Sequence, residues 1–355
     1  MKSDPKESKA KSEEQAPTVS GTAVTPPVID KLSFILPAFI GIDYVGGLPE
    51  DLLRRIDRAI EKNFAKKWHS QQSRFRMNLR FNLPSGARAQ VQIGAKKPME
   101  QKGGIRVELN PSKLKEGDIE LLYKRLRKVL GEYADLDDLL MKARVSRIDI
   151  AVNVIGCAIG DLLIGYKGVN QFTVFGNTMK GGEFQSANFG SLSSDYRAAV
   201  YDKRDETLRR ILEAAEKGGG AEGLKTARVA QLKAAASLPP TLRVEVRGMK
   251  IGVPVHKLLN AGKNRFERFQ FVELDGLTEL SELERRAFLA LVRQMGLKKA
   301  VELYRGDPLH SHLQKVVQQS ASWWQPVGLW KEGVKALAKS GIFPKEAFKK
   351  QKKKD

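Results

Sequence analysis

A short pattern that recurs three times constrains the fold of this chain more than any other feature. Arginine, an apolar residue, an acid and a second apolar residue follow one another in RVEL at 106–109, RIDI at 147–150 and RVEV at 243–246. Successive side chains of a β-strand point to opposite faces, so each copy places its apolar pair on one face and its charged pair on the other. The pattern therefore predicts an antiparallel sheet with one apolar and one polar face.

Other segments fit the same sheet. RFRMNLRFNL at 74–83 alternates strictly and is followed by the turn Pro84-Ser85-Gly86 and a second alternating run, which is typical of a β-hairpin. The stretches 48–66 and 117–131 have apolar residues at helical spacing. We therefore predict an α+β fold with a largely antiparallel sheet, one face covered by helices and one basic face.

The order of these patterns predicts the domain organisation. The stretches 31–131 and 146–254 each open with a strand and each carry the repeated pattern, which indicates two similar, internally duplicated halves. Outside them, the composition predicts three further parts: a disordered arm at 1–28, a helical C-terminal part at 255–343 and a Lys-rich tail at 344–355.

The charge of the chain predicts the class of its partner. Its 62 Lys and Arg against 41 Asp and Glu give a net charge of +21, which favours a polyanion, and nucleic acid above all, over solubility alone. The longest apolar stretch is too short and too interrupted for a membrane helix, so no membrane partner is expected. The single cysteine, Cys157, fits a reducing compartment, and the polar start does not resemble a signal peptide.

Carboxylates stand among arginines on the polar face, although Asp is a poor strand residue. Asp149, Glu245 and Glu108 are the acids of the three repeated patterns. Two interpretations remain open: a salt-bridged surface, or a phosphate site whose carboxylates also hold Mg²⁺ or Mn²⁺. In either case the neighbouring arginines provide a basic surface.

A tyrosine on the next predicted strand favours phosphate chemistry. In YRAAVYDK, alternation places Tyr201 on the same face as Arg197 and Lys203. Cations beside a phenol favour the phenolate and neutralise a phosphate under attack. A tyrosine nucleophile, cations and a metal ion are the parts needed for phosphodiester transesterification. His310 and His312 have the spacing of a metal-binding pair but a polar residue between them, and we interpret them as a surface pair.

These residues resemble a known family, the Rep-trans initiators of rolling-circle replication in small plasmids. The resemblance spans about residues 31–335 and comes in the family's order. Its segments are LSF at 32–34, IRVELNPSKL at 105–114, SRIDIAVNV at 146–154, NFGSLSSDYRAAVYDKRDE at 188–206 and LRVEVRGMK at 242–250.

The resemblance implies an enzyme, a metal-dependent and site-specific DNA nickase and strand transferase. Such a protein nicks one strand at a double-strand origin through a tyrosine, which becomes joined to the 5′ phosphate while the 3′ hydroxyl primes synthesis. The family's nucleophile falls on Tyr201, with Lys203 and Glu206 matching, and Tyr196 is the competing candidate. The family's acids fall on Asp149, Glu245 and Glu108, the expected ligands of Mg²⁺ or Mn²⁺. Asn153 and Arg247 stand where the family often has two further acids.

The resemblance also implies partners. It makes residues 29–254 the nicking domain and 255–343 a DNA-recognition part, in a homodimer that works with a host helicase in the bacterial cytoplasm. The DNA is a double-strand origin whose nick site is single-stranded or extruded as a cruciform. The arginines expected to bind it are Arg74, Arg76, Arg80, Arg106, Arg147, Arg243 and Arg247.

Three alternatives remain. A conjugative relaxase of the same family would act at a transfer origin. A non-catalytic origin-binding protein would bind DNA equally well without its tyrosine. An RNA-binding protein would prefer RNA and need no metal.

Overall fold

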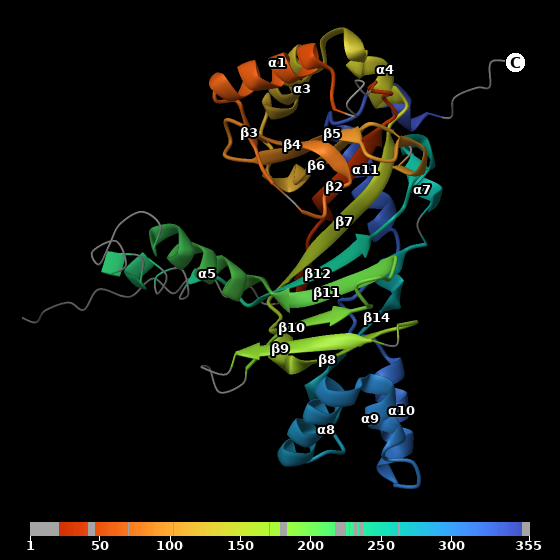
Figure 1. The fold of residues 1–355 in the computed structure, drawn as a ribbon. Coiled ribbons are helices and arrows are strands. Elements are labelled where there is room, and N and C mark those ends of the chain that lie inside the picture. The colour runs from red at the N-terminus through yellow and green to blue at the C-terminus, as the bar shows by residue number, and fades with distance from the viewer. Residues whose placement is uncertain are drawn as a thin grey trace, which may run out of the picture.

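A computed structural model provides the three-dimensional structure of the chain. It describes residues 21–349 apart from 42–46, 70, 102, 170, 178–182, 217–224, 227, 231–232, 234–236 and 262. A 12-stranded antiparallel sheet runs through the molecule in the order β3-β4-β5-β6-β2-β7-β12-β11-β10-β9, with β1 and β13 also pairing with β7 (Figure 1). The predicted α+β class and antiparallel sheet are confirmed.

The elements of the first half follow the sequence patterns closely. They are β1 (Ala23–Val24), β2 (Val28–Leu36), α1 (Glu50–Glu61), β3 (Ala65–Lys67), β4 (Phe75–Asn82), β5 (Arg88–Ala95), α2 (Pro98–Gln101), β6 (Ile105–Leu109), α3 (Asp118–Leu130) and α4 (Leu136–Met141). Helix α1 buries Leu52, Ile56 and Ala59, the spacing expected for one helical face. Both predicted helices of this half are therefore present.

The second half adds strands and one long helix, and the C-terminal part follows. The strands and helix of this half are β7 (Arg144–Ile155), β8 (Leu162–Tyr166), β9 (Phe172–Asn177), β10 (Glu183–Phe189), β11 (Tyr196–Asp202), α5 (Lys203–Glu216) and β12 (Thr241–Gly248). The C-terminal elements are β13 (Val253–Pro254), α7 (Leu258–Ala261), β14 (Phe269–Glu273), α8 (Glu282–Met295), α9 (Leu297–Glu302), α10 (Leu309–Gln318) and α11 (Leu329–Lys339).

The two halves share one strand order. In the first half β2 neighbours β6, then β5, then β4; in the second, β7 neighbours β12, then β11, then β10. In each case the first strand pairs with the last, and the earlier strands follow outward. The halves meet where β2 pairs with β7, at the centre of the sheet. This topology is what an internal duplication would produce.

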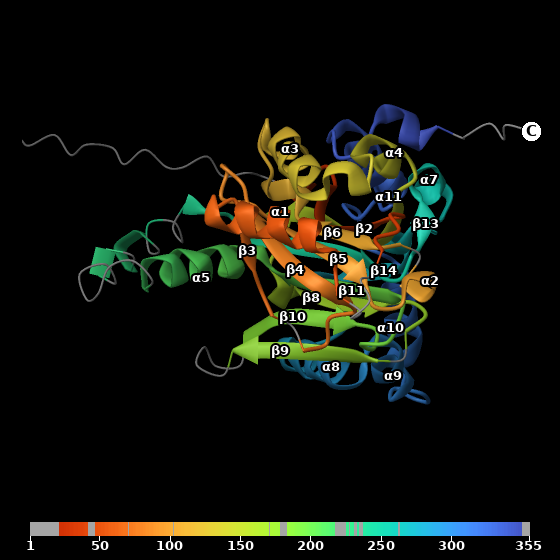
Figure 2. The same cartoon turned by 45° about the horizontal axis from the view of Figure 1, so that its top comes forward.

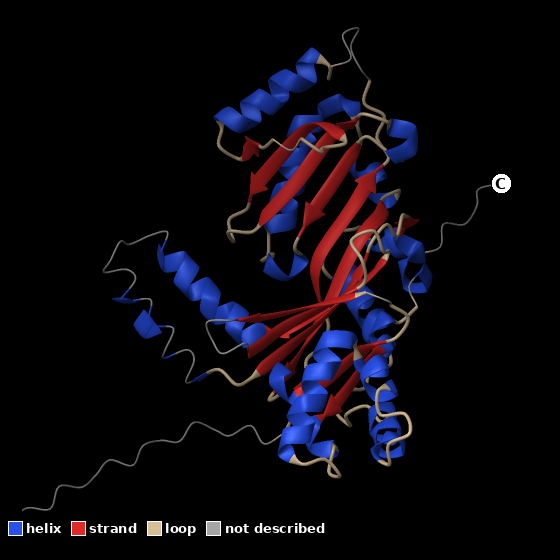
Figure 3. Cartoon of the chain, turned by 60° about the horizontal axis from the view of Figure 1, so that its bottom comes forward, coloured by secondary structure: helices blue, strands red, loops and turns tan. Residues whose placement is uncertain are grey.

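Helices cover the apolar face of the first half. Figure 3 shows these strands as one layer, with helices against one side of them. Helix α11 returns from the C-terminal part to pack on the centre of this face, where a Cβ on Gly333 would stand 2.8 Å from the side chain of Ile150. Glycine therefore permits this close approach of helix to strand, and Trp330 and Val334 fill the space beside it.

A small second sheet covers the second half. Strands β8 and β14 pair with each other, and Phe269 packs across Phe189 and Tyr166. Helices α8, α9 and α10 gather at this end of the molecule (Figure 2). With the opposite face of this pair they enclose a separate core, which includes Leu163 and Val272. The stretch predicted as helical from residue 255 is thus largely helical but also supplies β14, and Trp324 is buried with Trp330 as a hydrophobic anchor.

Both chain ends contribute more structure than predicted. Up to residue 20, the arm expected at 1–28 lies outside the described residues. Ala23 and Val24 form β1 and pair with Ile155 and Val154, since β7 extends beyond the pairing with β2 and offers free backbone groups on that side. In the predicted tail, Ala347 is buried, whereas residues 350–355 lie outside the description. Within the described part, no helix is long and apolar enough to cross a bilayer.

Tyr123 on α3 makes the fold sensitive to alkali. Its hydroxyl donates a hydrogen bond to the Ile342 carbonyl, and burial raises its pKa above the ordinary value of 10.0. Above about pH 10 an unfolded tyrosine ionises while the folded one keeps its proton, so stability present below that pH is lost as pH rises. We expect the thermal midpoint to fall less steeply between about pH 9 and pH 11 in Tyr123→Phe than in the wild type. Equal slopes in the two scans would contradict this assignment.

Candidate active site on the polar face of the sheet

Tyr201 stands in a polar row that crosses three neighbouring strands of the second half. Backbone pairing sets Tyr201 on β11 opposite Arg243 on β12, and Arg243 opposite Asn153 on β7. Side chains directly opposite in antiparallel strands lie on the same face, about 5 Å apart at Cβ. The sheet therefore presents the tyrosine beside an arginine, as its alternating sequence predicts.

The arginine of this row is held by a carboxylate that sequence reasoning missed. Arg243 is only 5% exposed, and its Nη2 lies 3.1 Å from Oδ1 of Asp30 on β2. Its Nη1 donates to Asn153 Oδ1 at 3.2 Å. The position of Asp30 could not be predicted from alternation, because the pairing of β2 with β7 shifts register between Ile29 and Lys31. The sequence signal for this residue is an acid within the otherwise largely apolar strand VIDKLSFIL at 28–36.

The surroundings of Tyr201 favour its neutral form. Burial is the largest cause and raises its pKa above the ordinary value of 10.0. Arg243 lowers the pKa, whereas the nearby charges of Glu245, Glu206 and Asp30 raise it further. The expectation that cations would favour the phenolate is thus wrong in direction, because desolvation and three carboxylates outweigh one close arginine.

Lys203 is not on the strand with Tyr201. Strand β11 ends at Asp202, whose Oδ1 accepts a hydrogen bond of 2.8 Å from the Asp205 backbone amide, and Lys203 opens α5. An aspartate that caps backbone amides begins a helix more readily than it continues a strand. From the first turn, Lys203 Nζ contacts Glu206 Oε2 at 2.5 Å, so the two family-matching residues form an ion pair beside the tyrosine.

Arg197 lies on the same face of β11 as Tyr201, and Ala199 is the residue of that face between them. Arg197 pairs across the strands with Arg247, which in turn stands opposite Asp149 on β7. The Nε of Arg197 is buried without a hydrogen-bond partner among the described residues. The row of Ala199 and Glu245 lies between this pair of arginines and the row of the tyrosine, so their guanidinium groups could contact a phosphate of the strand farther along the same face.

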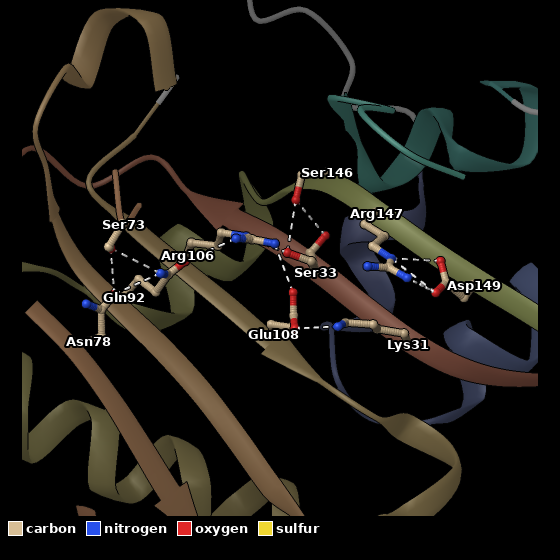
Figure 4. A network of polar contacts seen from close by, with 10 residues as sticks. All are labelled: Lys31, Ser33, Ser73, Asn78, Gln92, Arg106, Glu108, Ser146, Arg147 and Asp149. Carbon is tan, nitrogen blue, oxygen red and sulfur yellow. Dashed lines mark hydrogen bonds and ion pairs between the residues drawn. The ribbon is translucent and has the colours of Figure 1, made fainter. Parts of the chain in front are cut away.

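The three acids predicted to hold a metal ion are each engaged by basic side chains. Asp149 is 1% exposed, and Arg147 Nε donates to its Oδ1 and Oδ2 at 2.9 and 3.1 Å. Glu245 receives Arg247 Nε at 2.8 Å and Nη2 at 3.3 Å. Glu108 lies between Arg106 and Lys31, at 2.9 and 2.7 Å (Figure 4).

The strand order separates Glu108 from the other two acids. Asp149 and Glu245 are on adjacent strands, and burial, with a smaller contribution from the charge of Glu245, raises the pKa of Asp149. Glu108 on β6 is three strand spacings from Glu245, about 14 Å. Within the described residues, no three His, Cys, Asp or Glu side chains form a group that could hold a metal ion. All three predicted ligands are ion-paired with basic side chains, and β2 lies between Glu108 and the other two. This set does not fit one divalent cation.

The arginines predicted to bind DNA occupy three kinds of position. Arg243 is buried beside Tyr201. Three others form ion pairs with an acid two residues away on their own strand: Arg106, Arg147 and Arg247. The remaining three lie on or just before β4, with Arg74 exposed and the other two partly buried: Arg74, Arg76 and Arg80. Of these seven arginines, Arg74 alone is exposed, and the three on or before β4 are the ones for which no ion pair with an acid is described.

Comparisons with known proteins give only weak similarity to solved structures. No protein-family model matches the chain, and no curated protein is significantly similar to it in sequence. One solved structure with some similarity is a rolling circle replication initiator protein from Geobacillus stearothermophilus, with 13% sequence identity and a TM-score of 0.32. The match covers 86% of this chain and 100% of that one.

Proposed function

We propose that this chain is a rolling-circle replication initiator of the Rep-trans type, which nicks one strand of a double-strand origin and later rejoins it. The observation that supports this best is the position of Tyr201 on the polar sheet face, opposite Arg243 and near enough to Glu245, Glu206 and Asp30 for their charges to raise its pKa. The motif around this tyrosine is also the most specific part of the sequence resemblance.

The proposed reaction is a transesterification. The Oη of Tyr201 attacks the scissile phosphorus, a new P–O bond forms, and the bond from phosphorus to the 3′ oxygen breaks. The products are a 5′-phosphotyrosine and a free 3′ hydroxyl, which takes up a proton. Because one phosphodiester replaces another, the step needs no nucleoside triphosphate, and rejoining is its reverse.

The neighbouring side chains have distinct roles in this proposal. Tyr201 enters the reaction protonated because its pKa is raised, so a carboxylate has to accept the phenol proton during attack. Asp30 is the most exposed of the three nearby acids, with 26% of its side chain accessible, and is our candidate base. Arg197, Arg243 and Lys203 stabilise the charge that builds up on the phosphate.

The proposal includes partners beyond the origin. A P-loop for ATP is absent from the sequence, so strand separation falls to a helicase of the bacterial host. Following the family that it resembles, the chain acts as a homodimer in the cytoplasm and is encoded by a plasmid or another mobile element. The arginines of the first half and the region from residue 255 bind the origin DNA.

A nicking assay tests this function. A supercoiled plasmid that carries the DNA flanking this gene is incubated with the protein in Mn²⁺, Mg²⁺ or EDTA, and the products are separated on a denaturing gel. We expect open circles and a covalent protein–DNA band. Tight binding without any nick would contradict the proposal and favour a non-catalytic origin-binding protein. A reaction that survives EDTA would overturn the predicted use of a metal.

Salt dependence tests the DNA interface separately. If six or more phosphates contact basic side chains, counterion release weakens binding by about 1,000-fold or more between 50 and 200 mM salt. We expect a fall of that size for a duplex origin fragment, measured by fluorescence anisotropy. A flat response would contradict nucleic-acid binding through the basic face.

A further inference from the structure

The first half of the sheet has a position equivalent to that of Tyr201 in the second half. In the second half, Tyr201 on β11 pairs with the arginine of RVE at 243–245; in the first half, Gln92 on β5 pairs with the arginine of RVE at 106–108. The strand orders of the halves match, so Gln92 and Arg106 stand where the other half has Tyr201 and Arg243. An amide cannot act as a nucleophile, and this second position is therefore suited to binding.

The side chains at this position are held in place by hydrogen bonds to one another. Arg106 donates to Gln92 Oε1 at 3.1 Å and to Ser33 Oγ at 2.8 Å, and Gln92 Nε2 donates to Asn78 Oδ1 at 2.8 Å (Figure 4). Gln92 and Asn78 are both buried. A hydrogen-bonded network of this kind fixes the guanidinium in place and forms a preorganised floor for a ligand.

A basic pocket of about 640 Å³ lies over this floor. Its walls include Trp68, Arg74, Arg106, Arg144 and Arg147, and Glu100 is the one acid among its described lining residues. Burial is the main cause that lowers the pKa of Arg106; the charge of Glu108 raises it, and the charges of Arg147 and Arg74 lower it further. Such a cluster favours an anionic ligand that would relieve the repulsion.

Three buried donors in the same walls lack acceptors. Trp68 Nε1, Gln101 Nε2 and Arg144 Nε have no hydrogen-bond partner among the described residues. Each of these nitrogens is covered by protein atoms, so the case for an anionic ligand rests on the arginines that line the pocket. A phosphate joined to a nucleobase offers anionic oxygens for these arginines and an aromatic face for Trp68.

We propose that this pocket binds one nucleotide of the single strand that is nicked at Tyr201, with its phosphate on Arg144 and Arg74 and its base against Trp68. This inference rests on the proposed function. Arg147 in the pocket wall and Asn153 in the row of the tyrosine are six positions apart on β7, which is about 20 Å. The pocket would hold the strand at a second point along the same sheet face.

Binding in EDTA tests the pocket without requiring any nick. The probe is a fluorescein-labelled ten-nucleotide deoxythymidine strand, followed by anisotropy, with thymidine monophosphate as competitor. We expect Arg144→Met and Trp68→Leu each to weaken binding by about tenfold, Trp68→Phe to keep most of it, and Arg58→Met to match the wild type. Arg58 is an exposed arginine on α1, on the helix-covered side. Circular dichroism confirms that each variant is folded.

Two outcomes would overturn the inference. Equal affinities for Arg144→Met, Trp68→Leu and Arg58→Met would show that the strand does not use the pocket. Competition by thymidine monophosphate at the concentration of the ten-nucleotide strand itself would assign the pocket to free nucleotides. Neither result bears on nicking, and a wild type that binds through the pocket but never nicks would contradict the proposed function alone.

Discussion

Replacing Tyr201 with phenylalanine is expected to abolish the covalent protein–DNA adduct, with a fall of at least about 1,000-fold in the rate of nicking. Phenylalanine keeps the ring beside Arg243 but lacks the oxygen that forms the new bond to phosphorus. Binding of origin DNA should stay within about twofold of the wild type, since one phenol oxygen contributes little to an interface dominated by phosphate contacts. Single-turnover gel assays and anisotropy measure the two quantities.

The matched control is Tyr196→Phe. Tyr196 opens the same strand and pairs with Gly248 at the far end from Tyr201. We expect this variant to form the adduct at the wild-type rate. An adduct that persists in Tyr201→Phe and disappears in Tyr196→Phe would show that the nucleophile has been assigned to the wrong tyrosine.

Replacing Asp30 with asparagine is expected to cost about 2–3 kcal/mol of folding stability. Arg243 would remain buried at 5% exposure without its carboxylate partner, whose Oδ1 lies 3.1 Å from the guanidinium. The value is below that of a fully buried pair because a quarter of the Asp30 side chain, 26%, is accessible to solvent. Urea unfolding at pH 7 measures the loss.

The double variant separates charge from packing. In Asp30→Asn with Arg243→Met, no buried charge is left unpaired, so most of the lost stability should return. Nicking should not return, because both the candidate base and the arginine beside Tyr201 are gone. A double variant as unstable as the sum of the two single variants would contradict the account of this pair.

The polar and apolar faces could be predicted because alternation is a local property of a strand. The apolar positions of β7 and β12, for example Ile150 and Val244, are fully buried as expected. Asp30 could not be placed in this way, since the register shift in β2 depends on how two strands of different halves pair. The pairing of β8 with β14 joins segments about 100 residues apart and leaves no local trace.

The chemistry of the site was predictable in kind but not in arrangement. The Tyr201 motif placed a tyrosine among charged residues, and the structure brings it next to Arg243 and near Glu206. Which acid pairs with which arginine depends on side-chain rotamers, which alternation does not determine. Asp149 and Glu245 could serve a metal or an arginine equally well in sequence, and the structure pairs both with arginines.

Mass spectrometry of the trapped adduct tests the central claim most directly. Trypsin cleaves after Arg197 and Lys203, so Tyr201 falls in the peptide AAVYDK at 198–203 and Tyr196 in a different peptide. After nuclease digestion, the account predicts a nucleotide joined through its 5′ phosphate to Tyr201 in AAVYDK. A nucleotide on the peptide that ends at Arg197, or on no tyrosine at all, would contradict it.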